Sequence, residues 1–458
     1  METRPKMQKN NTFYHKIGKL VVPIVIQNLL SAAVSSADVV MLNYVGQSSI
    51  SAVSLASQYA SVLFMVFYGI GAGVTMLSAQ YYGKGDIQAI QTIQGIALRF
   101  SLIISAGFSL LALLIPQIMM RLFTNDSELI AIGASYLRCM SICYLCWGVT
   151  EVYIATLRST GKVFISTALN TLAFSVNVLL NAVFIFGLFG APKLGAAGVA
   201  IATSLSRLTE LLACFAVSAT GRYIRLDLRY LFVWDKALFS DFIRLSLPAL
   251  GNDVAWGTAF SMYSVIIGHL GTDAVAANSF VIVVRNFGTV LCFGAASAGG
   301  ILLGNIIGEN KMEEARKSAG KLLRLAIVTG IAGGLIILAS IPFVMQYADL
   351  SAQAMHYLKY MLLINTYYVL GAAVNNTMIA GIFRSGGDSR FGFLCDILDM
   401  WCYGVPLGFI AAFVLKLPVM WVYFLICTDE FVKWPWIIKH YRSGKWLHNI
   451  TRERKIPL

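Results

Sequence analysis

The sequence predicts an all-α integral membrane protein with twelve transmembrane helices in two parallel six-helix lobes. Three observations lead to this fold class. Of the 458 residues, 58% are hydrophobic and 12% are charged, which is about half the charged share of a soluble domain. Twelve apolar segments of about 20 residues, the length that spans a bilayer, alternate with short polar or glycine-rich links. The two halves of the chain also resemble each other.

Taken in order, the predicted helices are centred near residues 32, 65, 102, 142, 176, 207, 257, 289, 332, 367, 402 and 427. The first of them is too long for the apolar core of a signal peptide and lacks a clear cleavage site, so we expect it to be retained. The predicted domains are a cytoplasmic N-terminus (1–19), a first lobe (20–219), a cytoplasmic linker (220–242), a second lobe (243–440) and a basic cytoplasmic tail (441–458).

The distribution of positive charge predicts the orientation. Most of the 35 Lys and Arg residues lie in the termini and the even-numbered links, and cytoplasmic links are the ones rich in Lys and Arg. We therefore expect a multi-pass protein of the plasma (inner) membrane with both termini in the cytoplasm. The net charge of +13 then indicates a tail that anchors to anionic lipid rather than a nucleic-acid partner.

An internal repeat relates the two halves. The segment "VGQSSISAVSLAS" (45–57) aligns with "LGTDAVAANSFVI" (270–282), and Gly83 aligns with Gly308. After one inserted residue, Asn170 aligns with Asp396. Because each half holds six segments, both enter the membrane from the same side and form parallel repeats. Transporters built from such repeats commonly have their sites near the repeat interface.

Polar residues recur on one face of the first and fifth segments. These residues are Gln27, Ser31, Ser35 and Asp38, and Asn170, Asn177 and Asn181. Lipid cannot satisfy such groups, so these faces should look inward. Asp38 is interpreted as a carboxyl that binds and releases a proton or Na⁺, which we favour over a buried carboxyl that locks helix packing. For the asparagines, ligation and interhelical hydrogen bonding are equally good interpretations.

The second half carries a different set of acids. They are Asp253 on the seventh segment and Asp396 and Asp399 on the eleventh, with Tyr403 seven residues beyond Asp396. Asp396 and Asp399 could share a proton or attract a cationic substrate, or they could be neutralised by Arg285 or Arg207. The same arginines could pair with Glu151 and Glu210. Asp429 and Glu430, near Lys433, are expected to be interfacial anchors.

Enzyme signatures are missing from the sequence. We find no HExxH, P-loop, GxSxG or zinc-type Cys/His spacing, and each of those motifs supplies a specific chemistry. The eight scattered cysteines are interpreted as buried free thiols. We therefore expect no enzymatic activity and no cofactor, and the absence of a nucleotide-binding motif leaves ion-coupled transport.

Several motifs together resemble the multidrug and toxic compound extrusion (MATE) family. They are Pro23 fifteen residues before Asp38, the "VG" at 45–46, "RSTGK" after the fourth segment and "AGVAIATSLSR" (197–207). The resemblance covers about residues 15 to 440. It implies a V-shaped pair of lobes and antiport of cationic or aromatic compounds against H⁺ or Na⁺.

The resemblance also implies a first-lobe site. In one branch of the family, a helix-one aspartate, an Asn-x-x-x-Asp pair and a helix-six threonine bind the ion. Asp38, Asn177 and Thr203 match that pattern, whereas Asn181 stands where the pattern has an aspartate. The lost carboxylate slightly favours H⁺ over Na⁺. A second branch uses a glutamate and an aspartate in the second lobe, and here those positions hold Trp256 and only the amides Asn375 and Asn376.

These observations predict a multidrug efflux antiporter that works by alternating access, with Asp38 as the ion-coupling carboxylate. Its expected partners are a cationic, amphipathic small molecule and membrane lipids, and we expect a monomer. The nearest alternative is a lipid-linked oligosaccharide flippase, which the small number of intramembrane Lys and Arg residues disfavours. A membrane-embedded enzyme with a metal at Asp396 and Asp399 is a further alternative.

Overall fold

A computed structural model describes residues 4–42, 44–45, 47–348 and 350–453, with the side chains of all these except 4–12, 32, 35–40, 42 and 47. The described chain is helical and contains no β-strand. This confirms the predicted all-α class.

The first half of the chain forms six long helices and several short turns. The elements are α1 (Arg4–Leu42), α2 (Gln47–Lys84), α3 (Ile87–Leu114), α4 (Pro116–Arg121), α5 (Ser127–Ser159), α6 (Val163–Phe186), η1 (Leu188–Gly190), α7 (Gly195–Ala219) and η2 (Leu228–Leu231). Local sequence sets several ends. Asp86 caps α3 by accepting a hydrogen bond from the Ala89 amide, and Asp126 caps α5 in the same way, which satisfies amides that a helix start leaves unpaired.

The second half repeats this plan but with interrupted helices near its end. Its elements are α8 (Lys236–Gly268), α9 (Thr272–Gly308), α10 (Met312–Tyr347), α11 (Ala352–Asn376), η3 (Thr377–Phe383), α12 (Ser389–Asp396), η4 (Ile397–Gly404), α13 (Val405–Phe409), η5 (Ile410–Val414), α14 (Val419–Ile426), α15 (Asp429–Val432) and α16 (Trp434–Ser443). The segments η3, η4 and η5 are π-helical. Such widened turns are rare and frequently occur at functional sites.

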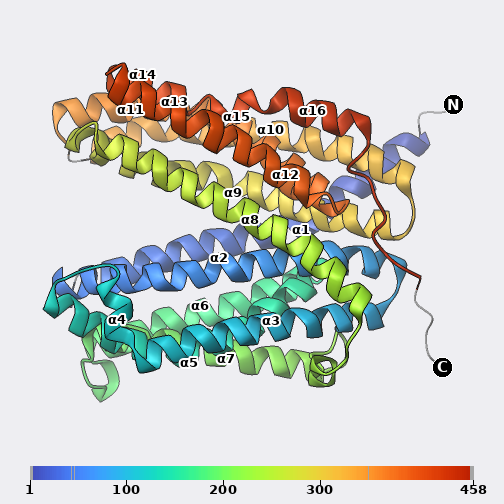
Figure 1. The fold of residues 1–458 in the computed structure, drawn as a ribbon, viewed down its shortest axis with the longest axis horizontal. Helices are drawn as coiled ribbons and strands as arrows, with labels where there is room; N and C mark the ends of the chain where they lie inside the picture. The colour runs from blue at the N-terminus through green and yellow to red at the C-terminus, as the bar shows by residue number, and fades with distance from the viewer. Residues whose placement is uncertain (1–3, 43, 46, 349, 454–458) are drawn as a thin grey trace. The chain divides into compact units, whose positions relative to one another are not determined.

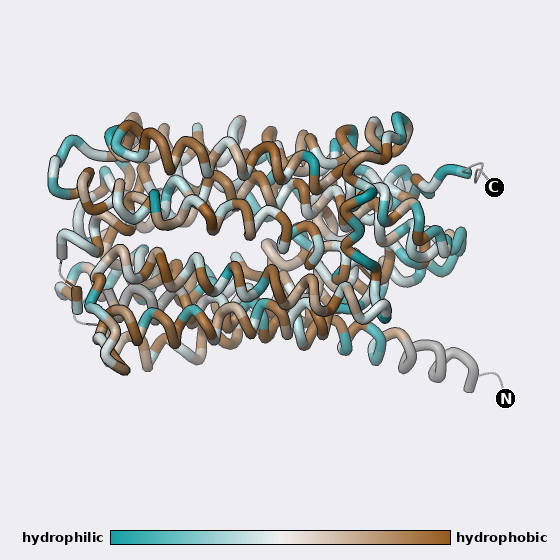
Figure 2. Tube along the Cα trace, turned by 90° about the horizontal axis from the view of Figure 1, so that it is seen from below, coloured by the Kyte–Doolittle hydropathy of each residue, from teal (hydrophilic) through white to brown (hydrophobic). Residues whose placement is uncertain are grey.

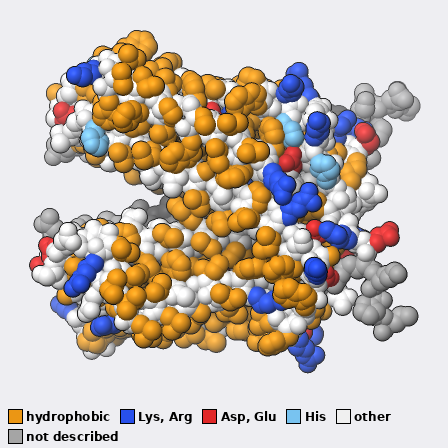
Figure 3. Space-filling model, viewed as in Figure 1, with side chains coloured by type: hydrophobic (Ala, Val, Ile, Leu, Met, Phe, Trp, Pro, Cys, Tyr) orange, Lys and Arg blue, Asp and Glu red, His pale blue; other side chains and the backbone are white. Residues whose placement is uncertain are grey.

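Eleven of the twelve predicted helix centres fall inside helical segments of the described chain, and the twelfth, at residue 427, falls at the break between α14 and α15. Within the described residues, eight helices are long and apolar enough to cross a membrane. Figure 2 shows hydrophilic residues concentrated towards the ends of the helices. Figure 3 shows apolar side chains over most of the visible face, as expected of a surface that contacts lipid.

By its internal contacts the chain divides into two units. The first-half unit comprises residues 26–78 and 86–246, and the second-half unit comprises 1–25, 79–85 and 247–458. In the first-half unit α5 packs against both α3 and α7, and α6 packs against α7. In the second-half unit α9, α10 and α11 pack against one another, as Figure 1 shows. The domain boundaries derived from the sequence stay a prediction.

The ends of α2 and α9 cross closely within the second-half unit. A Cβ atom on Gly83 would collide with the backbone oxygen of Asn305, and a Cβ atom on Gly308 would collide with that of Gln80. Gly83 aligns with Gly308 in the sequence repeat, and the same register aligns Gln80 with Asn305. The two contacts are therefore equivalent under the repeat, and each requires a residue without a side chain.

The described part of the C-terminal tail packs on the protein. Trp446 is buried and stacks on Tyr441. Gln80 donates hydrogen bonds to the carbonyl oxygens of Ser385 (2.7 Å) and His448 (3.1 Å), and accepts one from the Ile450 amide (2.8 Å). The end of α2 thus holds the tail as far as Arg452, whose amide donates to the Tyr81 hydroxyl (3.1 Å), and the buried Gln80 amide finds its partners there. The lipid anchor that the sequence suggests for this tail stays a prediction.

Candidate ion-coupling site

The first-half unit brings together three of the predicted site residues. On α6, the Asn181 amide donates to the side-chain oxygen of Asn177 (3.2 Å), and the Asn177 amide donates to the Thr203 hydroxyl on α7 (3.1 Å). Thr203 in turn donates to the Val199 carbonyl (2.9 Å). Asn177 and Asn181 are buried. Asn170, on the same predicted stripe, donates to the Ser166 carbonyl of its own helix.

The predicted polar face of α1 is only partly described. Asp38 and Ser35 lie on α1, but their side chains fall outside the described part of the structure. Gln27 is half-buried, and its side-chain oxygen has no hydrogen-bond partner within that part, while Ser31 is exposed. The role of this face stays a prediction.

Arg207, in the first-half unit, is already neutralised. It forms an ion pair with the fully buried Glu210 (2.8 Å) and lies over the ring of Trp147. Thr150 also donates to Glu210 (3.2 Å). The predicted pairing of Glu210 with Arg207 is confirmed. Glu151 instead pairs with Arg158 (3.0 Å), which lies nearer the end of α5.

In the second-half unit a single lysine lies among four carboxylates. The Lys433 ammonium lies 3.2 Å from Asp396, 3.1 Å from Asp399 and 3.4 Å from Glu430, and Asp429 is adjacent in sequence to Glu430. All five side chains are buried, with at most 5% of any residue exposed. We call these five residues the Lys433 cluster. Asp396 and Asp399, which the sequence spacing places on one helix face, both contact Lys433.

Two interpretations from the sequence are wrong here. Asp396 and Asp399 form ion pairs with Lys433 and not with Arg285 or Arg207, since Arg285 instead lies over the rings of Phe260 and Tyr368. Asp429 and Glu430 are not interfacial anchors, because both are buried. The helix break after Ile426 and the π-turn at η4 place these residues together. No periodicity in the sequence signals either irregularity.

Neutral side chains surround the cluster and donate to its carboxylates. The Tyr263 hydroxyl on α8 donates to Asp429 (2.9 Å), and the Tyr368 hydroxyl on α11 donates to Glu430 (3.4 Å). The Asn375 amide donates to both the backbone and the carboxylate of Glu430. Asn375 is one of the two amides on the tenth predicted segment, which has no carboxylate of its own. The carboxylate beside that segment is Glu430, which belongs to the twelfth segment.

The remaining predicted acid, Asp253, lies in a separate pair. Its carboxylate forms an ion pair with Arg384 (2.7 Å), which also donates to the side-chain oxygen of Asn252 (2.7 Å). Asn252 then donates to Asp396 (2.6 Å), so a hydrogen-bonded chain links the pair to the Lys433 cluster. Tyr403 bonds Thr428 at the helix break (3.0 Å).

The charges of the Lys433 cluster do not balance. Four ionised carboxylates against one ammonium would leave a net negative charge in a buried site, which is strongly unfavourable. The cluster therefore requires protons or a bound cation to exist at this burial. Among the described residues, no group of three or more His, Cys, Asp or Glu side chains has a geometry that could hold a metal ion.

The sequence repeat relates the two polar sites. Continuing the register that aligns Asn170 with Asp396 aligns Thr203 with Asp429 and Arg207 with Lys433. In the register of the first helices, Asp38 aligns with Tyr263. The second half thus has Tyr263 at the position of Asp38, and Asp429 at the position of Thr203.

This chain has two related halves of six predicted segments, and each half has buried ionisable groups. These features are typical of transporters with many membrane-spanning helices. The MatE family model matches residues 23–183 and 254–410, which cover the corresponding part of each half. The chain belongs to the MatE family of multidrug efflux transporters.

Individual proteins show the same similarity over almost the whole chain. The chain is 24% identical to the uncharacterized transporter YisQ of Bacillus subtilis over 97% of both chains. It is 27% identical to the multidrug resistance protein MdtK of Photorhabdus laumondii, covering 88% of this chain and 89% of MdtK. The fold matches that of a multidrug resistance MATE family transporter of the MOP superfamily in an outward-facing conformation. That match has a TM-score of 0.84 and 20% identity, over 94% of this chain and 96% of that one.

Proposed function

We propose that this protein is an efflux antiporter that exports small molecules in exchange for protons by alternating access. The observation that carries the proposal is the Lys433 cluster, a buried site whose charges balance only when its carboxylates take up protons. Ionisable residues inside a membrane protein are costly and mark ion pathways by default. Uptake or release of a proton changes the ion pairs within the Lys433 cluster, and with them the helix packing that the cluster favours.

The proposed cycle uses both halves of the chain. In the first half, Asp38 is the proton-binding carboxylate, and Asn177, Asn181 and Thr203 form the hydrogen-bonded site that accompanies it. In the second half, the Lys433 cluster takes up and releases protons. Coupling requires that protons and substrate bind the inward-open and outward-open states with different affinity, because a ligand that binds both equally shifts nothing.

Protons are preferred to Na⁺ as the coupling ion for a structural reason. The Lys433 ammonium already lies where a bound Na⁺ would contact Asp396, Asp399 and Glu430. In the first half, Asn177 and Asn181 supply amide oxygens rather than a second carboxylate. The first-half site therefore lacks the second carboxylate that would help to neutralise Na⁺, and in the second-half site a lysine already lies among the carboxylates.

The substrate class follows from the family and the relatives. Several relatives are named as multidrug resistance proteins, so we infer that the substrates here are amphipathic small molecules, cationic or aromatic. The concentration of Lys and Arg in the termini and even-numbered links supports a plasma-membrane location with both termini in the cytoplasm. We propose that the monomer is the transporting unit.

The decisive experiment is transport by purified protein in liposomes, with pH and sodium gradients imposed separately. We expect ethidium efflux to follow the pH gradient and to be largely lost in both Asp38→Asn and Asp429→Asn. Glu313→Gln, which changes an exposed acid on α10, is the matched control and should transport normally. Efflux driven only by sodium, or normal pumping by both variants, contradicts the proposal. Flipping of a lipid-linked sugar without dye efflux would favour the flippase instead.

A further inference from the structure

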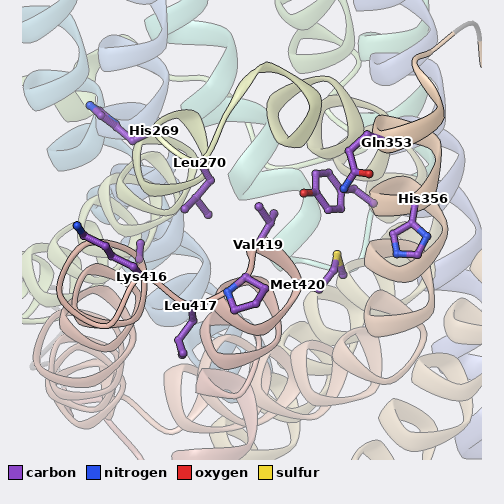
Figure 4. Close-up of a pocket in the computed structure, with 11 residues that line it drawn as sticks. His269, Leu270, Gln353, His356, Lys416, Leu417, Val419 and Met420 are labelled. Carbon is purple, nitrogen blue, oxygen red and sulfur yellow. The ribbon is translucent and has the colours of Figure 1, made fainter.

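A cavity lies at one end of the second-half unit, away from the residues of the Lys433 cluster. It has a volume of about 540 Å³ and is lined on its polar sides by His269, Gln353, His356, Tyr357 and Lys416. In Figure 4, His269 and Lys416 lie on one side of the cavity, and Gln353 and His356 lie on the other. None of its described lining residues is acidic, and Lys416 supplies an ammonium group.

The cavity lies at the ends of long helices. His269 follows the last residue of α8, Gln353 is in the first turn of α11, and Lys416 lies between η5 and α14. The ends of membrane-spanning helices lie at the boundary of the hydrocarbon core. A cavity between such ends therefore opens towards headgroups rather than acyl chains.

Lys416 occupies a backbone position that normally favours glycine. Its φ is +50°, in the left-handed region, and the following Leu417 amide donates to the Ala411 carbonyl (2.9 Å) to close the helix end. Glycine is the usual residue at such a helix terminus, and Gly187 (φ +71°) ends α6 in the first half. A lysine in this strained conformation supports the hypothesis that its side chain has a function.

Apolar surface adjoins the basic groups. Val414 and Leu415, immediately before Lys416, are 66% and 61% exposed. Inside the cavity, Leu270 and Val419 add apolar walls. A small soluble anion makes no favourable contact with apolar surface, whereas the acyl chains of a lipid would cover it. Basic pockets between transmembrane helices on the cytoplasmic side bind anionic headgroups, and this cavity offers the same chemistry at the membrane face that the charge distribution predicts to be the outer one.

From these observations we propose that this cavity binds the phosphate headgroup of an anionic phospholipid. Lys416 contacts the phosphate as a charged donor. His269, Gln353 and His356 surround the rest of the headgroup, and the acyl chains lie along Val414 and Leu415. The bound lipid offsets the unfavourable backbone conformation of Lys416 and fixes the end of the eleventh predicted helix.

The test is the stabilisation of delipidated, detergent-purified protein by added lipid. We expect dioleoyl phosphatidylglycerol to raise the unfolding temperature, and phosphatidylcholine or glycerol 3-phosphate to raise it much less. Lys416→Gly removes the charge and relieves the left-handed strain, so this variant should fold at least as well as wild type without lipid. It should need roughly fivefold to tenfold more phosphatidylglycerol for half of the shift.

Two comparisons keep the result unambiguous. Lys359→Gln changes an exposed lysine of α11 that does not line the cavity, and it should keep the wild-type response. Lys416→Gln removes the charge alone and should match Lys416→Gly in its weakened lipid response. A wild-type response in Lys416→Gly overturns the site. If glycerol 3-phosphate raises the unfolding temperature as much as phosphatidylglycerol does, the ligand is a soluble phosphate compound and the lipid proposal is wrong.

Discussion

The Tyr263 hydroxyl donates a 2.9 Å hydrogen bond to Asp429, and Tyr263 occupies the position in the second repeat that Asp38 occupies in the first. The first helix of the second lobe therefore contributes a donor, and the carboxylate comes from the last helix. This exchange keeps an acid in each half of the chain.

Tyr263→Phe should slow transport while keeping the fold. The ring still fills its buried site, but Asp429 loses a donor, which costs about 1–3 kcal/mol when a buried acceptor is left unsatisfied. We expect the initial rate of ethidium efflux under an imposed pH gradient to fall about tenfold, since each 1.4 kcal/mol corresponds to a factor of ten. Tyr347→Phe, at a residue that is 68% exposed, should be unchanged. An unaltered rate in Tyr263→Phe would show that this bond is dispensable.

Removing the cation of the Lys433 cluster should destabilise the protein strongly. Lys433→Met keeps the length of the side chain but leaves four buried carboxylates without a counter-ion, and breaking a buried ion pair typically costs about 3–5 kcal/mol. Thermal unfolding in detergent measures the loss. Adding Asp399→Asn should restore part of the stability, because it removes one of the uncompensated charges.

A matched lysine variant controls for the loss of any positive charge. Lys311→Met removes an exposed ion pair with Glu309, and such pairs contribute about 0–1 kcal/mol. If Lys433→Met is no less stable than Lys311→Met, the carboxylates around Lys433 must already be neutral without it.

The crossing of α2 and α9 should not tolerate a methyl group. In both Gly83→Ala and Gly308→Ala the new Cβ meets a backbone oxygen of the other helix, so the helices must separate, at a cost of about 3 kcal/mol for overpacking. Gly107→Ala in α3 is the control, because no atom lies within 4 Å of the position that its new methyl group would take. That change should be neutral or stabilise by about 0.5–1 kcal/mol. Unfolding curves of the three variants separate the two outcomes.

Gln80 should hold the C-terminal tail in place. Gln80→Ala removes hydrogen bonds to Ser385, His448 and Ile450 and should lower the free energy of unfolding by about 1–3 kcal/mol. The released tail should be cut faster by trypsin after Lys445, which mass spectrometry can follow over time. Gln88→Ala, at an exposed residue of α3, should keep the wild-type cleavage rate. Equal rates in both variants would mean that the tail is held by other contacts.

Much of the architecture could be predicted from the sequence because it depends on local composition. The lengths of the apolar segments determine where the helices lie in the chain. Gly83 and Gly308, which align in the sequence repeat, both lie where α2 and α9 cross. The spacing of Asp396 and Asp399 places both on one helix face. The proximity of Asn177, Asn181 and Thr203 is implied by resemblance to the family and is found in the structure.

The tertiary structure alone decided which charges meet. Lys433, Asp429 and Glu430 are close in sequence to the end of the last segment, and nothing local distinguishes buried residues there from interfacial ones. Their burial depends on a break after Ile426 and on π-turns in the neighbouring helix, each of which rotates the side chains that follow. Hydrophobic periodicity assumes a regular helix, so it cannot register such rotations. The sequence therefore determined the transporter fold and its candidate acids, and only the packing of irregular helices determined their partners.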